Sequence, residues 1–373
     1  MVRAILAAGL AAALAACAPA PANPGSAAGV PVYRVDAAWP QALPEDSGVQ
    51  LVFGQVAGVA VDNRNGHVWM VHRPASLLND EWDPKTNRPV THRCCKSLPP
   101  VVEFDAAGRY LRGWGGPGPG YEWPKVEHGI YVDPEGNVWV GGNGNEDNQI
   151  LKFTPDGRFL MQIGHAGKSE GSNSRTQLGR PAHMMLDAAA GELYVADGYG
   201  NRRVVVFDAK TGAYKRHWGA YGEVPNDDAQ APYDPAKPPA RQFGNPVHCV
   251  RIANDGLVYV CDRVNNRIQV FDKQGRFKHE FRVEVQTLAN GSVWDMVLSQ
   301  DAAQTHLYVA DGANGRIYIL RRNDGQVVGS FGRTGHMAGE FKWIHNLAID
   351  AQGNLYTSEV GFGRRAQKFE LVR

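Results

Sequence analysis

The sequence carries almost no net charge, and this absence excludes several classes of partner. Lysine and arginine number 39 against 38 aspartate and glutamate, for a formal net charge of +1 at pH 7. Proteins that bind nucleic acid, or anionic membranes through polybasic surfaces, concentrate positive charge. We therefore expect no nucleic-acid partner and no electrostatic attachment to a membrane.

Long hydrophobic runs are also scarce, and one short run stands at the N-terminus. Ile5 to Leu14 is apolar, follows Arg3, and is too short to span a bilayer as a mature helix. The run leads into Leu-Ala-Ala-Cys, which resembles a bacterial lipoprotein cleavage box ending at Cys17. Residues 1–17 are therefore predicted to be a lipoprotein signal peptide. An ordinary secretory signal is the alternative.

The predicted mature chain begins at a lipidated Cys17 and is exported. Residues 18–31, rich in alanine, proline and glycine, are predicted to be a flexible tether. Ala18 is not acidic, so nothing there indicates retention at the inner membrane. We expect an outer-membrane anchor that faces the periplasm, with the lipid as the only membrane contact.

Cysteine is rare, with five in the whole chain. Export permits disulfides among the four that follow the lipobox. Cys94 and Cys95 are adjacent, which allows either a vicinal bridge or pairing elsewhere. Cys249 and Cys261 flank one predicted hairpin, so they can bridge its two strands. Buried free thiols are the alternative at both places.

One pattern is repeated six times along the chain. It consists of a hydrophobic run that mostly closes on Asp, a turn, and a second run centred on an aromatic residue, as in GIYVDPEGNVWVGG at 129–142. Third strands in several units carry an Asn-x-Arg sequence. The six aromatic anchors are Trp69, Trp139, Tyr194, Tyr259, Tyr308 and Tyr356. Four short strands per unit form one propeller blade, and the pattern resembles the NHL repeat.

Residues 32–373 are thus predicted to form an all-β, six-bladed β-propeller. Segments 32–39 and 365–372 remain outside the six units, and a blade shared between them would close the ring. Residues 74–98 and 220–243 are too long for turns and are predicted to be loops on one face. No helix is required.

Four histidines share one position in their blades. His128, His183, His248 and His345 each lie eleven residues before the aromatic anchor of their blade. Equivalent positions of the innermost strands converge on the propeller axis. Three imidazoles with an open fourth position are typical of a catalytic zinc site, although iron and other divalent ions also suit three histidines.

His183 departs from this register when the count is made to the end of its strand. His128 and His345 lie five residues before the closing Asp, whereas His183 lies four residues before Asp187. A shift of one residue turns a strand side chain to the other face. His183 is therefore predicted to be a wall residue, a residue that orients a ligand, or an additional ligand.

From residue 54 to the C-terminus the chain resembles the peptidyl-hydroxyglycine lyase unit of peptidylglycine α-amidating enzymes. The zinc ligands of that family match His128 in VEHGIYVD, His248 in GNPVH and His345 in FKWIHNLAID. Gly200 and Val270 stand at two positions where the family has disulfide cysteines. The resemblance implies a central zinc held by the three histidines.

The same resemblance implies roles for residues around the metal. Arg73, in an His-Arg dipeptide, and Arg263, in an Asp-Arg turn, match the two site arginines. Tyr199, in an Asp-Gly-Tyr turn, matches the catalytic tyrosine. A structural calcium of the family would correspond to Val59, Ile130 and Asn346, where Asn346 replaces an acidic ligand.

The predicted function is a zinc-dependent carbon–nitrogen lyase that cleaves an N-α-hydroxyalkyl amide to an amide and a glyoxylate-type product. The expected substrate is a small or peptide-like molecule with a carboxylate, which an arginine can hold with two hydrogen bonds. Two alternatives stay open: a periplasmic metal-dependent hydrolase or lactonase, and a non-catalytic propeller lipoprotein that binds a partner. Metal content and turnover distinguish the three.

Overall fold

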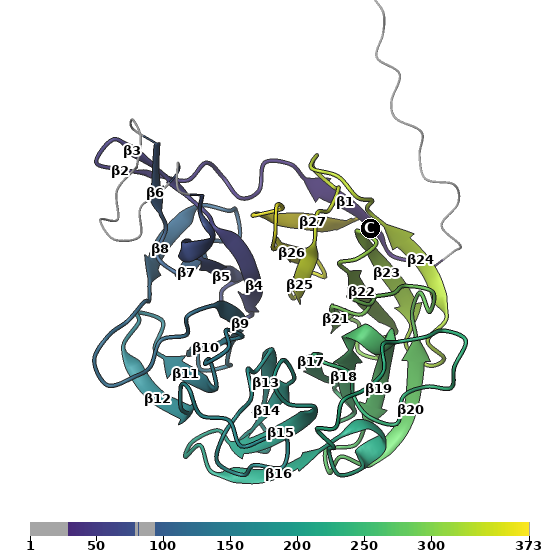
Figure 1. Ribbon diagram of the computed structural model, residues 1–373. Coiled ribbons are helices and arrows are strands. Elements are labelled where there is room, and N and C mark those ends of the chain that lie inside the picture. The colour runs from purple at the N-terminus through teal and green to yellow at the C-terminus, as the bar shows by residue number, and fades with distance from the viewer. Residues whose placement is uncertain (1–28, 79–80, 82–93, 373) are drawn as a thin grey trace, which may run out of the picture.

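The computed structural model describes residues 29–78, 81 and 94–372, and these stretches consist mainly of short β-strands joined by turns. The predicted signal peptide, Cys17 and nearly all of the tether lie outside the described residues. Six four-stranded antiparallel sheets surround a central axis, and one edge strand of each sheet lies innermost (Figure 1). The predicted all-β, six-bladed β-propeller is confirmed.

The first three blades follow one another along the chain. Blade 1 comprises β4 (Gln55–Asp62), β5 (His67–Arg73), β7 (Val101–Phe104) and β8 (Tyr110–Trp114). Blade 2 comprises β9 (Glu127–Val132), β10 (Val138–Gly142), β11 (Gln149–Phe153) and β12 (Phe159–Gly164). Blade 3 comprises β13 (His183–Asp187), β14 (Glu192–Asp197), β15 (Arg203–Asp208) and β16 (Tyr214–Trp218).

The remaining blades complete the ring. Blade 4 comprises β17 (Val247–Ile252), β18 (Val258–Asp262), β19 (Arg267–Phe271) and β20 (Phe277–Arg282). Blade 5 comprises β21 (Asp295–Leu298), β22 (His306–Asp311), β23 (Arg316–Arg321) and β24 (Val327–Phe331). Blade 6 comprises β25 (Ile344–Ile349), β26 (Leu355–Glu359), β27 (Ala366–Val372) and β1 (Val32–Asp36).

Blade 6 joins the two ends of the described chain. β1 pairs antiparallel with β27, with Val32 opposite Val372 and Asp36 opposite Lys368. Each innermost strand contacts the next in the order β4, β9, β13, β17, β21 and β25, and β25 contacts β4. The shared closing blade predicted from the two leftover segments is therefore present.

Local hydrogen bonds explain the repeated turn between the first and second strands. In blade 2, Asp133 Oδ1 accepts from the backbone N–H groups of Glu135 and Asn137, at 3.0 and 2.8 Å. Gly136 has a φ of +90°, a conformation that glycine adopts without a Cβ clash. Asp350 makes the same turn in blade 6.

The aromatic anchor of each unit is buried between sheets. All six anchors are at most 2% exposed. Trp139 Nε1 donates to Asp133 Oδ2, and Tyr356 Oη donates to Asp350 Oδ2, each at 3.1 Å. The closing Asp thus serves both the turn and the buried aromatic, because burying a polar N–H or O–H without a partner is costly.

Several short elements lie outside the blades. They are the strands β2 (Glu45–Asp46), β3 (Val49–Val52) and β6 (Cys94–Ser97), and the 3-10 turns η1 (Pro74–Ser76), η2 (Ala220–Gly222) and η3 (Arg263–Asn265). The prediction of a loop throughout 74–98 is wrong at its end, because β6 pairs in parallel with β3. Residues 79–80 and 82–93 of that loop lie outside the described residues.

The predicted hairpin disulfide is present. Cys249 and Cys261 lie directly opposite each other on β17 and β18 and are bonded, with their Cα atoms 4.8 Å apart. Cys95 is also disulfide-bonded. Among the described residues, no helix has the length and apolar character needed to cross a bilayer.

Candidate metal centre

The innermost strands of all six blades share one register where they enter the channel. Five residues before the end of each run stand Ala57, His128, Ala182, His248, Trp294 and His345. In β9, β17 and β25 the pairing with the second strand shifts at the histidine, so each strand has one extra residue there. Such bulges re-aim a side chain, commonly beside active sites.

The three histidines of alternate blades meet on the axis. His128, His248 and His345 are 2–3% exposed, and one ligand atom from each lies within 4.8 Å of the others. Their ring centroids are 4.6 Å (His128–His345), 4.9 Å (His248–His345) and 5.2 Å (His128–His248) apart. The predicted grouping of these three residues is therefore seen in the structure.

Each imidazole is oriented by a backbone carbonyl of the neighbouring blade. His128 Nδ1 donates to the carbonyl of Ala182 (2.8 Å) and His345 Nδ1 to that of Ala57 (2.6 Å). His248 Nδ1 contacts the carbonyl of Trp294 in the same way. Because a carbonyl only accepts, the proton is on Nδ1 and the lone pair on Nε2 faces the axis.

Burial keeps these imidazoles neutral. Burial, together with the nearby guanidinium of Arg73, lowers the pKa of His345 to about 3. Burial, followed by the neighbouring histidines, holds the pKa of His128 and His248 well below its usual value. Three neutral imidazoles with free Nε2 atoms and carbonyl-bonded Nδ1 atoms fit a divalent metal ion.

Tyr199 faces the point where the three Nε2 atoms converge. Its hydroxyl oxygen lies 3.0 Å from His128 Nε2 and 3.0 Å from His248 Nε2. Arg263 Nη1 donates to the same oxygen at 3.2 Å. Arg263 is 8% exposed, and its guanidinium stacks on the ring of Trp294 at 4.4 Å. The cation is thus held beside the phenol oxygen.

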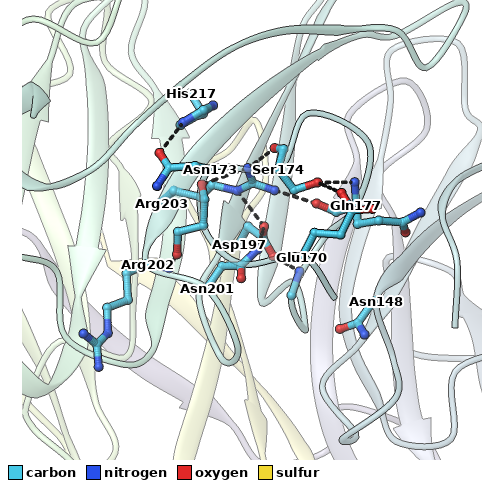
Figure 2. Close-up of polar contacts among 12 residues, drawn as sticks. Asn148, Glu170, Asn173, Ser174, Gln177, Asp197, Asn201, Arg202, Arg203 and His217 are labelled. Carbon is cyan, nitrogen blue, oxygen red and sulfur yellow. Dashed lines mark hydrogen bonds and ion pairs between the residues drawn. The ribbon is translucent and has the colours of Figure 1, made fainter. Parts of the chain in front are cut away.

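A buried ion pair shapes the turn that carries Tyr199. Arg203 and Asp197 are both fully buried, and Arg203 Nε donates to Asp197 Oδ2 at 2.9 Å (Figure 2). Asn201 Nδ2 donates to the same oxygen at 2.7 Å. The Asn-x-Arg repeat therefore closes the turn between β14 and β15, and Tyr199 lies at its tip.

Arg73 is the last residue of β5 in blade 1, whereas Arg263 follows β18 in blade 4. Arg73 Nε donates to the carbonyl of Glu127 (2.7 Å), Nη1 to Gln55 Oε1 (2.9 Å) and Nη2 to Asn143 Oδ1 (3.3 Å). Burial raises the pKa of Glu127 to about 7. A guanidinium has five N–H groups, so two remain for a ligand.

His183 is not a member of the histidine group. Ala182 occupies the ring position in blade 3, and its N–H donates to the carbonyl of Ala196 at 2.8 Å. His183 is the next residue along β13, and its buried Nδ1 has no hydrogen-bond partner among the described residues. The one-residue shift inferred from the strand count explains why His183 is a wall residue and not an additional ligand.

One layer further along the channel, the residues do not fit a calcium ion. Asn346 Oδ1 already accepts from the N–H of Val59 (3.0 Å), and its amide nitrogen contacts Asp295. Arg251 Nη2 donates to Asp295 Oδ2 at 2.8 Å. Arg251 shares the channel wall with Val59 and Ile130, so its permanent charge would repel a second cation. The expected calcium site does not suit this chain.

Sequence reasoning missed two residues of blade 5, Trp294 and Asp295. Trp294 orients His248 through its carbonyl and supports Arg263 through its ring. Asp295 is fully buried and pairs with Arg251. Their position in the repeat could have identified them, because Trp294 lies five residues before Ser299 just as His128 lies five residues before Asp133.

Comparison with known proteins gives relatives of two kinds. The family model of the NHL repeat matches residues 247–271. A Drosophila melanogaster peptidyl-alpha-hydroxyglycine alpha-amidating lyase 1 is 25% identical over 347 residues, which is 88% of this chain and 58% of the relative. Mouse NHL repeat-containing protein 3 is 27% identical over 252 residues, 65% of this chain and 57% of that protein.

A Xenopus laevis peptidyl-glycine alpha-amidating monooxygenase B is 26% identical over 340 residues, 87% of this chain and 34% of that protein. The chain thus spans less than two thirds of the length of these relatives. Among solved structures, a streptogramin B lyase matches with a TM-score of 0.52 and 14% identity over 88% of this chain and 97% of that one. This last likeness shows the fold alone.

Proposed function

We propose that this protein is a zinc-dependent carbon–nitrogen lyase that cleaves N-α-hydroxyalkyl amides bearing a carboxylate. One observation carries the proposal: the Tyr199 hydroxyl lies 3.0 Å from two of three convergent histidine Nε2 atoms while Arg263 donates to it. The relatives named as alpha-amidating lyases support the reaction class.

The residues around the three histidines have distinct roles in the proposed reaction. A zinc ion held by His128, His248 and His345 would make a bound hydroxyl more acidic. Tyr199, as the phenolate, accepts the hydroxyl proton, and the Arg263 N–H stabilises negative charge on the phenol oxygen. The two remaining N–H groups of Arg73 hold the substrate carboxylate.

The reaction needs no further reactant. The hydroxyl proton passes to Tyr199, the electron pair of the O–H bond forms the carbonyl, and the C–N bond breaks with its pair on nitrogen. The nitrogen then takes the proton from Tyr199. The products are a primary amide and glyoxylate, and Tyr199 returns to its starting state.

The metal is tested by content and by substitution. The purified full chain is expected to hold one zinc per molecule, whereas His128→Ala, His248→Ala and His345→Ala each lose stoichiometric metal. His183→Ala is the matched control, because it is a buried channel histidine outside the group. The site proposal fails if all three ligand variants keep wild-type zinc.

Turnover is measured as glyoxylate released from α-hydroxyhippuric acid. Tyr199→Phe is expected to keep its zinc and lose activity by about 10²–10⁴-fold, the usual range for a general acid–base group. An undiminished rate removes Tyr199 from this role. Zinc-loaded wild type without glyoxylate release on this substrate contradicts the lyase and favours a binding function.

We further propose that the enzyme acts in the periplasm, anchored to the outer membrane through a lipid on Cys17. The sequence of the N-terminal segment supports this location. A Cys17→Ser variant is expected to leave the membrane fraction when cells are fractionated, while the wild type stays in it. Equal partition of both proteins would contradict the anchor.

A further inference from the structure

We propose that Arg180, the third arginine of the site, also binds substrate, and that the site therefore selects substrates with a second anionic group at the end of the acyl part. This inference rests on the proposed lyase function and names its substrate class. The substrate would be the half-amide of a short dicarboxylic acid with α-hydroxyglycine, and the products a dicarboxylic half-amide and glyoxylate.

Arg180 lies beside the same tyrosine as Arg263. Its guanidinium carbon is 5.9 Å from the ring centroid of Tyr199, and that of Arg263 is 5.7 Å from the same point. Arg180 Nε donates to the carbonyl of Asn143 at 2.9 Å, and the side chain of Asn143 accepts from Arg73. Asn143 therefore links two of the three guanidinium groups.

The backbone of Arg180 is held firmly although its conformation is unusual. Its φ of +59° lies in the left-handed region, which non-glycine residues seldom adopt and which is often found at functional sites. Its N–H donates to Asn148 Oδ1 at 2.9 Å, and its carbonyl accepts from the N–H of Tyr199 at 3.1 Å. The adjacent Gly179 donates to Asp197 Oδ1.

The network of Arg203 fixes the loop that precedes Arg180. Arg203 donates to the carbonyls of Ser172 and Gln177, at 2.9 and 2.7 Å, and also contacts that of Ser174. Figure 2 shows Ser174 and Gln177 beside Arg203. The loop that carries Arg180 is thus held in place by hydrogen bonds, and none of the described residues accepts a hydrogen bond from the Arg180 Nη atoms.

Three positive charges at this site lack a negative partner. Within the part of the chain that the structure describes, Arg73, Arg180 and Arg263 form no ion pair. The two nearby carboxylates are engaged elsewhere: Asp147 accepts from the backbone N–H groups of Lys125, Val126 and Gly144. Glu127 accepts from Trp123 Nε1 at 2.9 Å.

The proposed reaction uses only two of these charges. Arg73 holds the carboxylate of the hydroxyglycine part, and Arg263 supports Tyr199. The half-buried Arg180 keeps both Nη atoms without a partner among the described residues. Three neighbouring guanidinium groups without a carboxylate partner are stabilised when an anion binds between them. The charge-assisted hydrogen bonds that Arg180 would donate to such an anion are stronger than hydrogen bonds between neutral groups.

The test compares two unreactive ligands of equal length, N-succinylglycine and N-butyrylglycine, which differ by a terminal carboxylate. Calorimetry on the zinc-loaded full chain is expected to show about tenfold tighter binding of N-succinylglycine, at the low end for a hydrogen bond to a charged group. Arg180→Gln is expected to abolish this preference and Arg180→Lys to keep part of it. Arg175→Gln, an exposed arginine of the same loop, is the control and keeps it.

Equal binding of the two ligands by wild type, or a preference retained in Arg180→Gln, overturns the inference. A preference lost equally in Arg175→Gln overturns it too, because general charge would then explain the effect. Turnover separates this from the lyase proposal: glyoxylate is expected faster from N-succinyl-α-hydroxyglycine than from the N-butyryl compound. If neither releases glyoxylate, the lyase fails while calorimetry still decides the role of Arg180.

Discussion

Replacing Arg251 with methionine removes the cation that the channel holds one layer from the histidines. Arg251 Nε donates to the carbonyl of Met296 (2.7 Å), and its Nη2 to the carbonyl of Leu347 (2.9 Å) and to Asp295 (2.8 Å). Asp295 is fully buried, so the variant leaves a carboxylate without its countercharge.

Loss of one partner from a buried ion pair costs about 3–5 kcal/mol of folding free energy. We expect the lower end, about 3 kcal/mol, because Asp295 keeps the N–H donors of Met296 and Leu347 and the amide of Asn346. For a chain of this size, 1 kcal/mol shifts the melting temperature by about 2 °C. Arg251→Met should therefore melt about 6 °C below wild type at pH 7.

The deficit should shrink at acid pH. Burial raises the pKa of Asp295 above its ordinary value, and the nearby Arg251 opposes this rise. Without Arg251 the folded state binds a proton that the unfolded state releases, so lowering the pH stabilises the variant relative to wild type. Thermal unfolding followed by circular dichroism at pH 7 and pH 5 measures both differences.

A double variant isolates the pair. Arg251→Met with Asp295→Asn should recover most of the lost stability, since no buried charge remains unpaired. A single variant as stable as wild type, or a deficit that grows as the pH falls, refutes the reasoning. Millimolar calcium is expected to leave the wild-type melting temperature unchanged, and a clear rise would mean that the channel binds the ion despite Arg251.

Three further predictions concern stability. Burial lowers the pKa of His72 from 6.5 to about 4, so the wild-type free energy of unfolding should fall as the pH drops through this range, by up to about 1.4 kcal/mol per pH unit. The variant His72→Asn should show a smaller pH dependence when the free energy of unfolding is measured by urea titration. Replacing Cys249 and Cys261 with serine should cost about 3 kcal/mol of folding free energy, given their separation of 12 residues, and should reduce the loss of stability that reductant causes in the wild type. Tyr33→Ala should lower the melting temperature, because Tyr33 packs on blade 5 and secures the closing strand.

Much of the site was predictable because, in a propeller, equivalent strand positions of different blades lie at the same height around the axis. The histidines of blades 2, 4 and 6 lie at equal distances from strand ends, so their convergence follows once the six-fold repeat is recognised. The strand count also placed His183 out of step, and Ala182 does occupy its ring position. Strand pairing forces these outcomes, since residues of one register share one height and one face.

Other features depend on contacts between blades that no repeat encodes. Arg251 of blade 4 reaches across to Asp295 of blade 5 and the carbonyl of Leu347 in blade 6. Arg180 lies beside Tyr199, and its Nε donates to the carbonyl of Asn143, from blade 2. The strand β6 forms because β3 happens to lie beside it. Each of these contacts depends on how far a side chain extends and on the path of a loop, and a periodic sequence pattern specifies neither.

The sequence alone determined the blade count, the closing of the ring by both ends and the convergence of the three histidines. These follow from local hydrogen bonding and period-two burial, which act within a blade. Only the tertiary structure decided what fills the channel beside the three histidines. There the choice between a calcium ion and the guanidinium of Arg251 depends on whether a long side chain from one blade reaches a carboxylate of the next, and it does.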